Sequence, residues 1–393
     1  MIFALFIVRI GIDCRFWGIE HAGLGRYTKE LVLNLLKIDK KNNYFLFLRQ
    51  SKGREIKKSK RIEKVFFDTP HYSLKEQFLF PRKIAKYNLD LFHFPHFNVP
   101  IFLWRTPFIV TIHDLIKHFF KGRTVTTRNP LTYSIKRVGY HLVIDKAIKK
   151  AKAVIIPSHF VKDQVVVHYP GVEDKVMVIY EGVGRSFKLQ GSSFKLQGSK
   201  ILKKYKIKKP YFIYVGNVYP FKNVYLLLQA IKYLNDLNHL KNNIQLVIVC
   251  SRDVFWKRLE RQVKKLGLGK EVVMPGQLSD KDLSILLKKA SAFVTASLME
   301  GFGLPGLEAL STGCPVLAAR AGSLPEIYGE AAIYFDPQNV NDLVGKMKKV
   351  LQLNKNERNI IIKKGRKQSK KYSWEKTAEE TLGTYKGIFA ELA

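Results

Sequence analysis

Cysteine is scarce in this chain, with only three among its 393 residues. Cys14, Cys250 and Cys314 lie far apart and show no paired spacing, so the sequence indicates neither a disulfide framework nor a zinc site. This cysteine usage is typical of proteins that work in a reducing cytoplasm.

Long apolar runs are lacking as well. Residues 1–8 are apolar, but the run is short, is followed by Arg9 and leads directly into Gly11-Ile12-Asp13. The run therefore predicts a first buried strand, and no signal-peptide cleavage pattern follows it. Because no other apolar run approaches the length of a membrane-spanning helix, we expect a cytoplasmic protein.

Acidic residues are also few, with 32 against 68 lysines and arginines, which gives a formal net charge of +36. The densest basic patches are residues 57–61 and 117–137, and the second patch interleaves basic residues with Phe119, Phe120, Leu131 and Tyr133. This mixture suits the headgroups of an anionic membrane, so we expect peripheral association with its inner face. Nucleic acid would attract the same charges, but the sequence contains no recognisable nucleic-acid module. A solvated, lysine-rich surface is the remaining explanation.

The stretch that indicates function most clearly is residues 292–337. Its apolar start predicts a buried strand, the glycines at 301 and 303 free the backbone to approach a ligand, and Pro305 suits the first turn of a helix that Gly313 ends. The amide groups and positive dipole at such a helix start attract a diphosphate without any metal. Glu300 and Glu308 would then accept hydrogen bonds from sugar or ribose hydroxyls, which predicts a nucleotide-sugar site.

The spacing of Glu300 and Glu308, with GFGLP between them and AGSLPEI after them, resembles the signature of the retaining glycosyltransferases of family 4. In that family the first glutamate contacts the donor sugar and the second contacts the nucleotide ribose. The resemblance passes these roles to Glu300 and Glu308. It also implies that the diphosphate is held by backbone amides of the segment between them, formed by Gly301, Phe302, Gly303, Leu304 and Pro305.

Apolar runs alternate with amphipathic stretches along the whole chain, which predicts an α/β fold with parallel sheets. The resemblance implies two facing Rossmann-like domains, the GT-B fold, with the last helix crossing back to the first domain. We expect an N-terminal acceptor domain at residues 1–182, a donor domain at 206–372 and the returning helix at 373–393. Residues 183–205 hold two copies of SFKLQGS and are interpreted as a lengthened linker. The predicted strands are residues 45–48, 65–67, 91–94, 108–112, 153–156, 212–215, 245–249, 272–274, 292–296, 316–318 and 332–335.

In the first domain, three groups of residues follow predicted strands. Gly23 and Gly25 form a G-x-G at a helix start, which the resemblance places near the donor phosphates. His113, followed by Asp114, matches a family motif that places the histidine beside the donor sugar; a strand-capping role is the alternative. His93 and His96 have no third ligand nearby, so we expect that they line a pocket and bind no metal.

In the second domain, a strand at residues 212–215 leads to Gly216, Asn217, Lys222 and Asn223. The Lys222 ammonium at a helix start is placed to neutralise a diphosphate. Many relatives carry an arginine where this chain has Asn217, and Arg185 or Arg252 is the candidate substitute. Leu278 belongs to a segment whose backbone meets the nucleobase in the family.

Asp280 and Asp282 form a D-x-D that could hold a metal in another transferase fold. They directly precede an apolar-periodic segment, so helix capping explains them better. We therefore expect no metal site and no cofactor.

Taken with the resemblance, the residues predict a metal-independent retaining glycosyltransferase, with His113, Glu300 and Lys222 at the reacting centre. It would move a hexose, such as mannose or glucose, from a nucleotide diphosphate to a glycan or lipid-linked acceptor. A nucleotide-sugar epimerase of similar architecture is one alternative. A basic membrane- or nucleic-acid-binding protein with a degenerate pocket is another. A dehydrogenase is disfavoured, because no G-x-G-x-x-G with an acidic partner opens either domain.

Overall fold

The computed structural model describes residues 7–18, 22–57, 59–122, 126, 129–188, 194–236 and 243–392. These residues fold into two compact units. Unit 1 takes its described residues from the ranges 1–115, 128–182 and 374–393, and unit 2 from 116–127 and 183–373.

Unit 1 is built on a parallel sheet with the strand order β3-β2-β1-β4-β5-β6-β7. The chain order reverses direction between β1 and β4, which makes this the switch point of the sheet. The central strands are buried on both faces, as expected for parallel strands covered by helices. The bounds are β1 Arg9–Asp13, β2 Asn43–Leu48, β3 Ile62–Phe66, β4 Leu91–Phe94, β5 Phe108–Thr111, β6 Ala153–Ile156 and β7 Val176–Val178.

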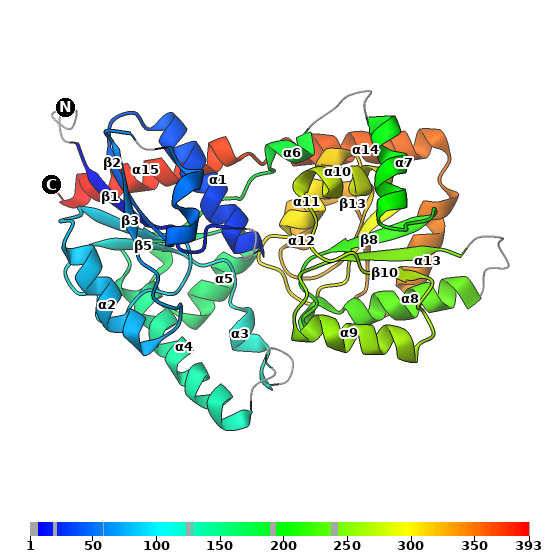
Figure 1. Cartoon of the computed structure of the whole chain (residues 1–393), viewed down its shortest axis with the longest axis horizontal. Coiled ribbons are helices and arrows are strands. Elements are labelled where there is room, and N and C mark those ends of the chain that lie inside the picture. Colours follow the sequence, from blue (N-terminus) through cyan, green and yellow to red (C-terminus); the bar gives the residue numbers. More distant parts are fainter. Residues whose placement is uncertain are drawn as a thin grey trace. The chain divides into compact units, whose positions relative to one another are not determined.

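The last helix of the chain, α15 (Trp374–Leu392), belongs to unit 1 and lies along α1 (Ala22–Ile38) (Figure 1). The Tyr385 hydroxyl bonds Nδ1 of buried His93 at 2.7 Å, and Thr377 donates to the carbonyl of Tyr180 at 2.7 Å. These contacts confirm that the final helix completes the first domain. The other helices of unit 1 are α2 Leu74–Ala85, α4 Pro130–Lys150 and α5 His159–His168, with 3₁₀ turns at Gln50–Glu55 and Glu173–Lys175.

Unit 2 has a second parallel sheet, with the order β10-β9-β8-β11-β12-β13. Its switch point lies between β8 and β11. The bounds are β8 Tyr211–Val215, β9 Gln245–Val249, β10 Val272–Val273, β11 Ala292–Thr295, β12 Val316–Ala319 and β13 Ala332–Phe335. The predicted α/β class with two parallel-sheet domains is therefore confirmed.

Helices α6 to α14 of unit 2 flank this sheet (Figure 1). They are α6 Arg185–Lys188, α7 Phe194–Lys204, α8 Val224–Asp236, α9 Val254–Lys265, α10 Asp280–Lys289, α11 Leu304–Thr312, α12 Leu324–Tyr328, α13 Val340–Gln352 and α14 Lys355–Ser369, with 3₁₀ turns at Pro220–Lys222 and Gly329–Ala331. The short helix α3, Ile116–Phe119, is also grouped with unit 2. In the part of the chain that the structure describes, no helix combines the length and apolarity needed to span a bilayer.

Three expectations differ from the structure. The first strand begins at Arg9, and Ile7 before it is 60% exposed, while residues 1–6 of the predicted strand lie outside the described residues. The expected linker contains α6 and α7, which contact α10, because apolar side chains such as Phe187 are buried in unit 2. Residues 189–193 of the duplication lie outside the described residues. Strand β7 was not predicted.

Candidate functional site

The candidate donor site lies at the switch point of unit 2, where the chain leaves β8 and β11. These neighbouring parallel strands end at the same edge of the sheet, so the segments that follow them meet there. The amide of Leu298, after β11, donates to the carbonyl of Phe221, after β8, at 2.9 Å. This backbone bond holds the two segments together and brings Lys222 close to Glu300.

Lys222 and Glu300 form an ion pair at the centre of this site. The Lys222 ammonium lies 2.7 Å from Glu300 Oε1, and the two side chains are 14% and 18% exposed. The Ser297 hydroxyl donates to the same carboxylate oxygen at 2.7 Å and lies 3.3 Å from the hydroxyl of Thr295. Two residues predicted from separate motifs are therefore in direct contact, and Ser297 is a further member that the sequence analysis missed.

The segment after β12 supports the backbone of Glu300. Gly322 has a φ of +58°, and a Cβ at this position would lie 2.7 Å from the Glu300 nitrogen and 2.8 Å from its carbonyl oxygen. The amide of Ser323 donates to the Glu300 carbonyl at 3.2 Å. The AGSLPEI motif therefore needs glycine at 322 because two backbones touch there. Direct buttressing of Glu300 was not inferred from the motif.

The glycine-rich turn leads into α11 as predicted. Gly303 is the residue before the helix, with a φ of +90°, and its carbonyl accepts a hydrogen bond of 2.5 Å from the Tyr328 hydroxyl. The side chains of Phe302 and Leu304 are buried, with 4% and 7% exposure, so they anchor the turn in the core. Any ligand contact of Gly301 to Pro305 would thus come chiefly from the backbone. Glu308, one turn into α11, is 3% exposed.

The segment after β8 is tightly folded around its glycine. Gly216 has a φ of +145°, and the Tyr214 hydroxyl donates to the Asn217 carbonyl at 2.5 Å. Asn223 adopts a left-handed conformation, and its side-chain amide donates to the Pro337 carbonyl at 2.8 Å. Asn223 therefore connects the segments after β8 and β13.

Near Leu278, which is half-buried, the Arg252 side chain lies against Gly276. A Cβ on Gly276 would be 3.3 Å from Arg252 Nε, and the guanidinium stands 5.7 Å from the Trp256 ring centre. Arg252 thus follows β9 and reaches the segment after β10, at the edge of the sheet that carries Lys222. The side chain of Arg185, the other candidate cation, lies outside the described part of the structure.

In unit 1, His113 follows β5, and both of its ring nitrogens face acceptors. Nδ1 lies 3.2 Å from Glu181 Oε1 and Nε2 lies 2.9 Å from the carbonyl of Pro95. Burial lowers the pKa of His113, but the hydrogen bond and charge of Glu181, aided by the Pro95 carbonyl, outweigh burial and raise it. The arrangement favours the imidazolium form.

The glycines of the predicted G-x-G differ in their surroundings. A Cβ on Gly25 would lie 1.9 Å from the carbonyl oxygen of Gly18, whereas a Cβ on Gly23 would meet nothing within 4 Å. Gly25 is therefore required by a close approach of two backbones in unit 1. Gly23 lies in the first turn of α1, close to residues 19–21, which the structure does not describe.

The histidines at 93 and 96 have separate surroundings. His93 is fully buried between the hydroxyls of Tyr385 and Thr111, and burial lowers its pKa to about 3. His96 is half-buried, with its ring 5.0 Å from that of Phe16. Among the described residues, no group of three or more His, Cys, Asp or Glu side chains could hold a metal ion.

The D-x-D lies at the start of α10, where Ser279 is the capping residue and accepts from the Asp282 amide. Asp282 accepts hydrogen bonds from Tyr205 at 2.6 Å and Lys204 at 2.8 Å. The predicted helix cap is therefore present, but its capping residue is Ser279 and neither aspartate of the D-x-D. Asp282 instead connects α10 to the end of α7.

Models of known families match most of the chain in two parts. Residues 199–368 match the family described as glycosyl transferases group 1, and residues 22–186 match glycosyltransferase family 4. The chain is 27% identical to O-antigen chain mannosyltransferase B of Escherichia coli over 93% of this chain and 96% of that protein. It is also 27% identical to the O-antigen chain mannosyltransferase RfbU of Salmonella typhimurium, over 66% and 64% of the two chains.

Solved structures with the same fold cover nearly the whole chain. Sucrose-phosphate synthase from Thermosynechococcus elongatus superposes with a TM-score of 0.76 at 19% identity, over 98% of this chain and 100% of that one. Anabaena HepE, in complex with UDP and glucose, gives a TM-score of 0.73 at 17% identity, over 97% and 100%. Identities at this level show the fold alone.

Proposed function

Because this chain belongs to the group 1 glycosyltransferases of GT-B fold, we propose that it transfers a hexose from a nucleotide-diphosphate sugar to a glycan acceptor with retention of configuration. The observation that carries the proposal is the Lys222–Glu300 ion pair at the switch point of unit 2. A cation for the diphosphate and an acceptor for sugar hydroxyls stand there side by side.

The chemistry follows from the charges that develop when a sugar–phosphate bond breaks. Negative charge grows on the diphosphate, where Lys222 and the backbone amides that open α11 would stabilise it. When Lys222 binds the phosphate, its ion pair with Glu300 would break, and the Glu300 carboxylate would accept hydrogen bonds from sugar hydroxyls instead. The hydrogen bond from Ser297 would keep the Glu300 carboxylate in place. Since these groups can supply the positive charge, we propose a metal-independent reaction without a cofactor.

We propose mannose as the transferred sugar and a lipid-linked or free glycan as the acceptor. The support comes from relatives that are described as O-antigen chain mannosyltransferases and that match 93% and 66% of this chain. The epimerase and binding-protein alternatives are not favoured by these relatives.

Thermal unfolding in the presence of UDP, GDP, ADP and their sugar conjugates, with and without EDTA, tests the donor site. A ligand that binds the folded state raises its melting temperature, so we expect one nucleoside diphosphate to give a clear shift that EDTA leaves unchanged. The absence of any shift would contradict the donor site. Loss of the shift with EDTA would contradict the metal-free mechanism.

The acceptor proposal includes an anionic membrane, because unit 1 carries a broad apolar surface. Helix α4 exposes a stripe at a spacing of three and four residues, and its N-terminal half stands away from the sheet of unit 1 (Figure 1). Beside it, on α2 and the segment after β4, further apolar side chains are exposed. We call this surface the apolar face; it consists of Leu74, Phe78, Leu79, Phe102, Trp104, Leu131, Ile135, Val138 and Leu142.

Charge indicates which partner the apolar face fits. The sequence from Leu115 to Ile144 contains no acidic residue but six lysines and arginines. On α4 itself, Lys136 is exposed and Arg137 is half-buried beside the stripe. Apolar and basic side chains on one helix suit the boundary between anionic headgroups and acyl chains. We therefore propose a peripheral position at the inner face of the membrane.

Trp104 provides a direct measurement of this docking. It is 74% exposed, whereas the other three tryptophans of the chain, at 17, 256 and 374, are 0%, 5% and 2% exposed. We expect anionic vesicles to shift the tryptophan emission to the blue and neutral vesicles to leave it unchanged. The Trp104→Phe variant should bind the vesicles but lose the shift. A shift that accompanies self-association without vesicles would instead identify a second copy as the partner of this face.

A further inference from the structure

The switch point of unit 1 holds a cluster of buried charges and aromatic rings that the donor site does not use. Asp13 ends β1, and Arg15 and Phe16 follow it; His96 and Asn98 follow β4, the neighbouring strand across the switch point. Open α/β sheets bind ligands outside the carboxyl ends of their strands at such a point. The sheet of unit 1 therefore has its own position for a ligand.

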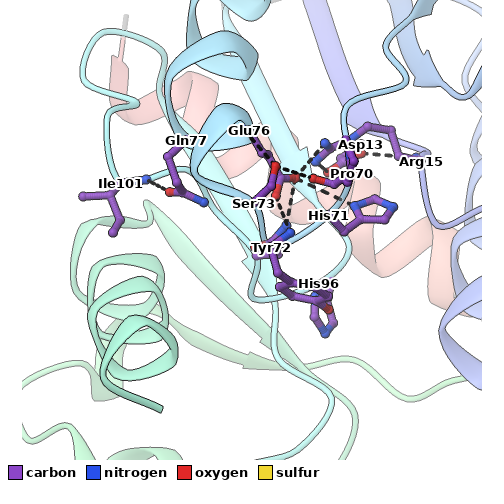
Figure 2. Close-up of polar contacts among 11 residues, drawn as sticks. Asp13, Arg15, Pro70, His71, Tyr72, Ser73, Glu76, Gln77, His96 and Ile101 are labelled. Carbon is purple, nitrogen blue, oxygen red and sulfur yellow. Dashed lines mark hydrogen bonds and ion pairs between the residues drawn. The ribbon is translucent and has the colours of Figure 1, made fainter. Parts of the chain in front are cut away.

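Arg15 is the centre of the cluster and is 1% exposed (Figure 2). Its guanidinium forms a two-bond pair with Asp13, at 2.7 and 2.6 Å, and a third contact of 2.7 Å with Glu76 of α2. Glu76 also accepts from the side-chain amide of Asn98 at 2.9 Å. Burying these charges costs free energy that the pairs offset only with good geometry, so the cluster fixes the position of α2 relative to β1.

Glu76 also fixes the turn that precedes α2. Its second oxygen accepts from the backbone amide of Tyr72 at 2.7 Å, while Ser73 caps the helix. Tyr72 has a φ of +60°, a conformation that L-residues with a large side chain rarely adopt. Backbone strain of this kind persists only where the surroundings enforce it, and it gathers at ligand sites. Here the buried Arg15–Glu76 pair enforces it.

This turn places the ring of Tyr72 at the surface, next to the rings of His96 and Phe16. Tyr72 is 51% exposed, and its hydroxyl lies 3.4 Å from Nδ1 of His96. Its ring centre is 6.0 Å from that of His96 and 6.3 Å from that of Phe16. Phe16 in turn stacks on His71 at 4.0 Å. Figure 2 shows Tyr72 and His96 side by side, with Arg15 farther from His96 than Tyr72 is.

We propose that Tyr72 and His96 form an acceptor subsite, in which a pyranose ring of the acceptor glycan stacks on the Tyr72 ring; this inference rests on the proposed function. A pyranose has C–H groups on its faces and hydroxyls at its edge. An aromatic ring with polar groups at its rim matches that distribution. The Tyr72 hydroxyl and the His96 ring supply the polar rim, and the buried Arg15–Glu76 pair acts as the positioning element.

The probes for this subsite are methyl α-mannopyranoside, α-mannobiose and methyl α-glucopyranoside. Their binding is measured by saturation-transfer NMR in the presence of a saturating nucleoside diphosphate, which occupies the donor site. The main variant is Tyr72→Gly, because glycine adopts a positive φ without strain and the protein should remain folded. Tyr72→Phe keeps the ring. Tyr233→Ala removes a tyrosine of similar exposure, 45%, from α8 in unit 2.

We expect Tyr72→Gly to weaken binding of the preferred probe about tenfold and Tyr72→Phe to stay within about threefold of the unmodified protein. Tyr233→Ala should bind normally, and the thermal shift with nucleoside diphosphate should be the same in all four proteins. Equal binding by Tyr72→Gly, or binding of none of the three probes by the unmodified protein, would overturn the subsite. Loss of the nucleotide shift in the unmodified protein would instead contradict the proposed donor site.

Discussion

At the scale of single residues, the ion pair of Lys222 and Glu300 couples two functions. The ammonium is suited to the diphosphate and the carboxylate to the sugar, yet the two lie 2.7 Å apart and hold each other in place. Removing either side chain therefore removes a ligand contact and also the ion pair that helps to position the other. Their contributions to the reaction should not be additive.

We expect Lys222→Ala and Glu300→Gln each to lower kcat/KM by about 10²–10³, the loss typical of removing one preorganised charge-stabilising group. The double variant should lose less than the product of the two losses. Initial rates of sugar transfer provide the measurement. As a control, Lys29→Ala breaks an exposed ion pair with Glu55, 3.3 Å long, and should leave the rate unchanged. Activity within a fewfold of the unmodified protein in both single variants would refute the site.

His113 predicts a pH dependence of stability. Glu181 and the Pro95 carbonyl raise its pKa in the folded state, so the folded protein binds the proton more tightly than the unfolded chain does. This stabilisation is complete below the unfolded pKa of about 6.5 and is lost as pH rises through the folded value. Denaturant unfolding of the unmodified protein and His113→Gln should show a larger difference in unfolding free energy at about pH 5.5 than at about pH 8.5. A difference that grows with pH would contradict the assignment.

At the scale of elements, the segments after the strands of unit 2 support one another through their backbones. Gly322, after β12, touches the backbone of Glu300, after β11, and Asn223, after β8, bonds the carbonyl of Pro337, after β13. The geometry of the candidate site thus depends on segments that carry none of its charged groups.

Gly322→Ala tests this support. The substitution combines a φ of +58° with a Cβ only 2.7 Å from the Glu300 nitrogen, so we expect it to lower the unfolding free energy by about 3 kcal/mol and to reduce transfer strongly. Gly171→Ala is the matched control, because Gly171 has a φ of +84° but open space around its Cβ position. It should cost about 1 kcal/mol and leave transfer unchanged. Equal losses in both variants would mean that the Glu300 contact is unimportant.

Elements with a strong local signal were predictable from the sequence. Strands such as β4 and β9 consist mainly of apolar residues, and their predicted bounds agree with the structure. The edge strand β7 is only three residues long and its Met177 is 42% exposed, so its sequence lacks that signal. The duplicated segment looked like a linker because it is polar, but Phe187 is buried in unit 2.

The site was predictable to the extent that its residues belong to short motifs. Glu300, Gly303 and Glu308 lie within nine residues, and their local structure follows from glycine and proline preferences. The pairing of Arg15 with Glu76 was not predictable, because the two are distant in the sequence and only the sheet brings them together. Nothing in the sequence around Arg15, a single arginine after a strand, predicts that its side chain is buried.

At the scale of the whole molecule, the charge of +36 dominates the long-range behaviour of the protein. Basic residues outnumber acidic ones about two to one, and four residues of the apolar face, those on α4, belong to the acid-free segment from Leu115 to Ile144. Electrostatic attraction should bring the protein to an anionic bilayer, and the apolar side chains should then hold it there.

Binding to anionic vesicles should therefore have an electrostatic contribution, which salt weakens, and an apolar contribution, which remains at high salt. Raising the ionic strength from about 0.1 to about 1 M shortens the Debye length from about 10 to about 3 Å, so we expect cosedimentation to fall steeply. A variant with Ile135 and Val138 replaced by serine should bind more weakly at low salt and lose all binding at high salt. Salt-independent cosedimentation of the unmodified protein would contradict the electrostatic contribution.

Helix α15 has a consequence for how the protein is made. Its Tyr385 bonds His93 across 292 positions of the sequence, and all of unit 2 except residues 116–127 is encoded between the main part of unit 1 and this helix. On the ribosome, the first unit to emerge must wait with an uncovered α1 surface while the second is translated and can already fold. During synthesis, unit 1 is therefore exposed to chaperones for longer than unit 2. A premature stop codon before residue 374 would leave unit 1 permanently without its last helix.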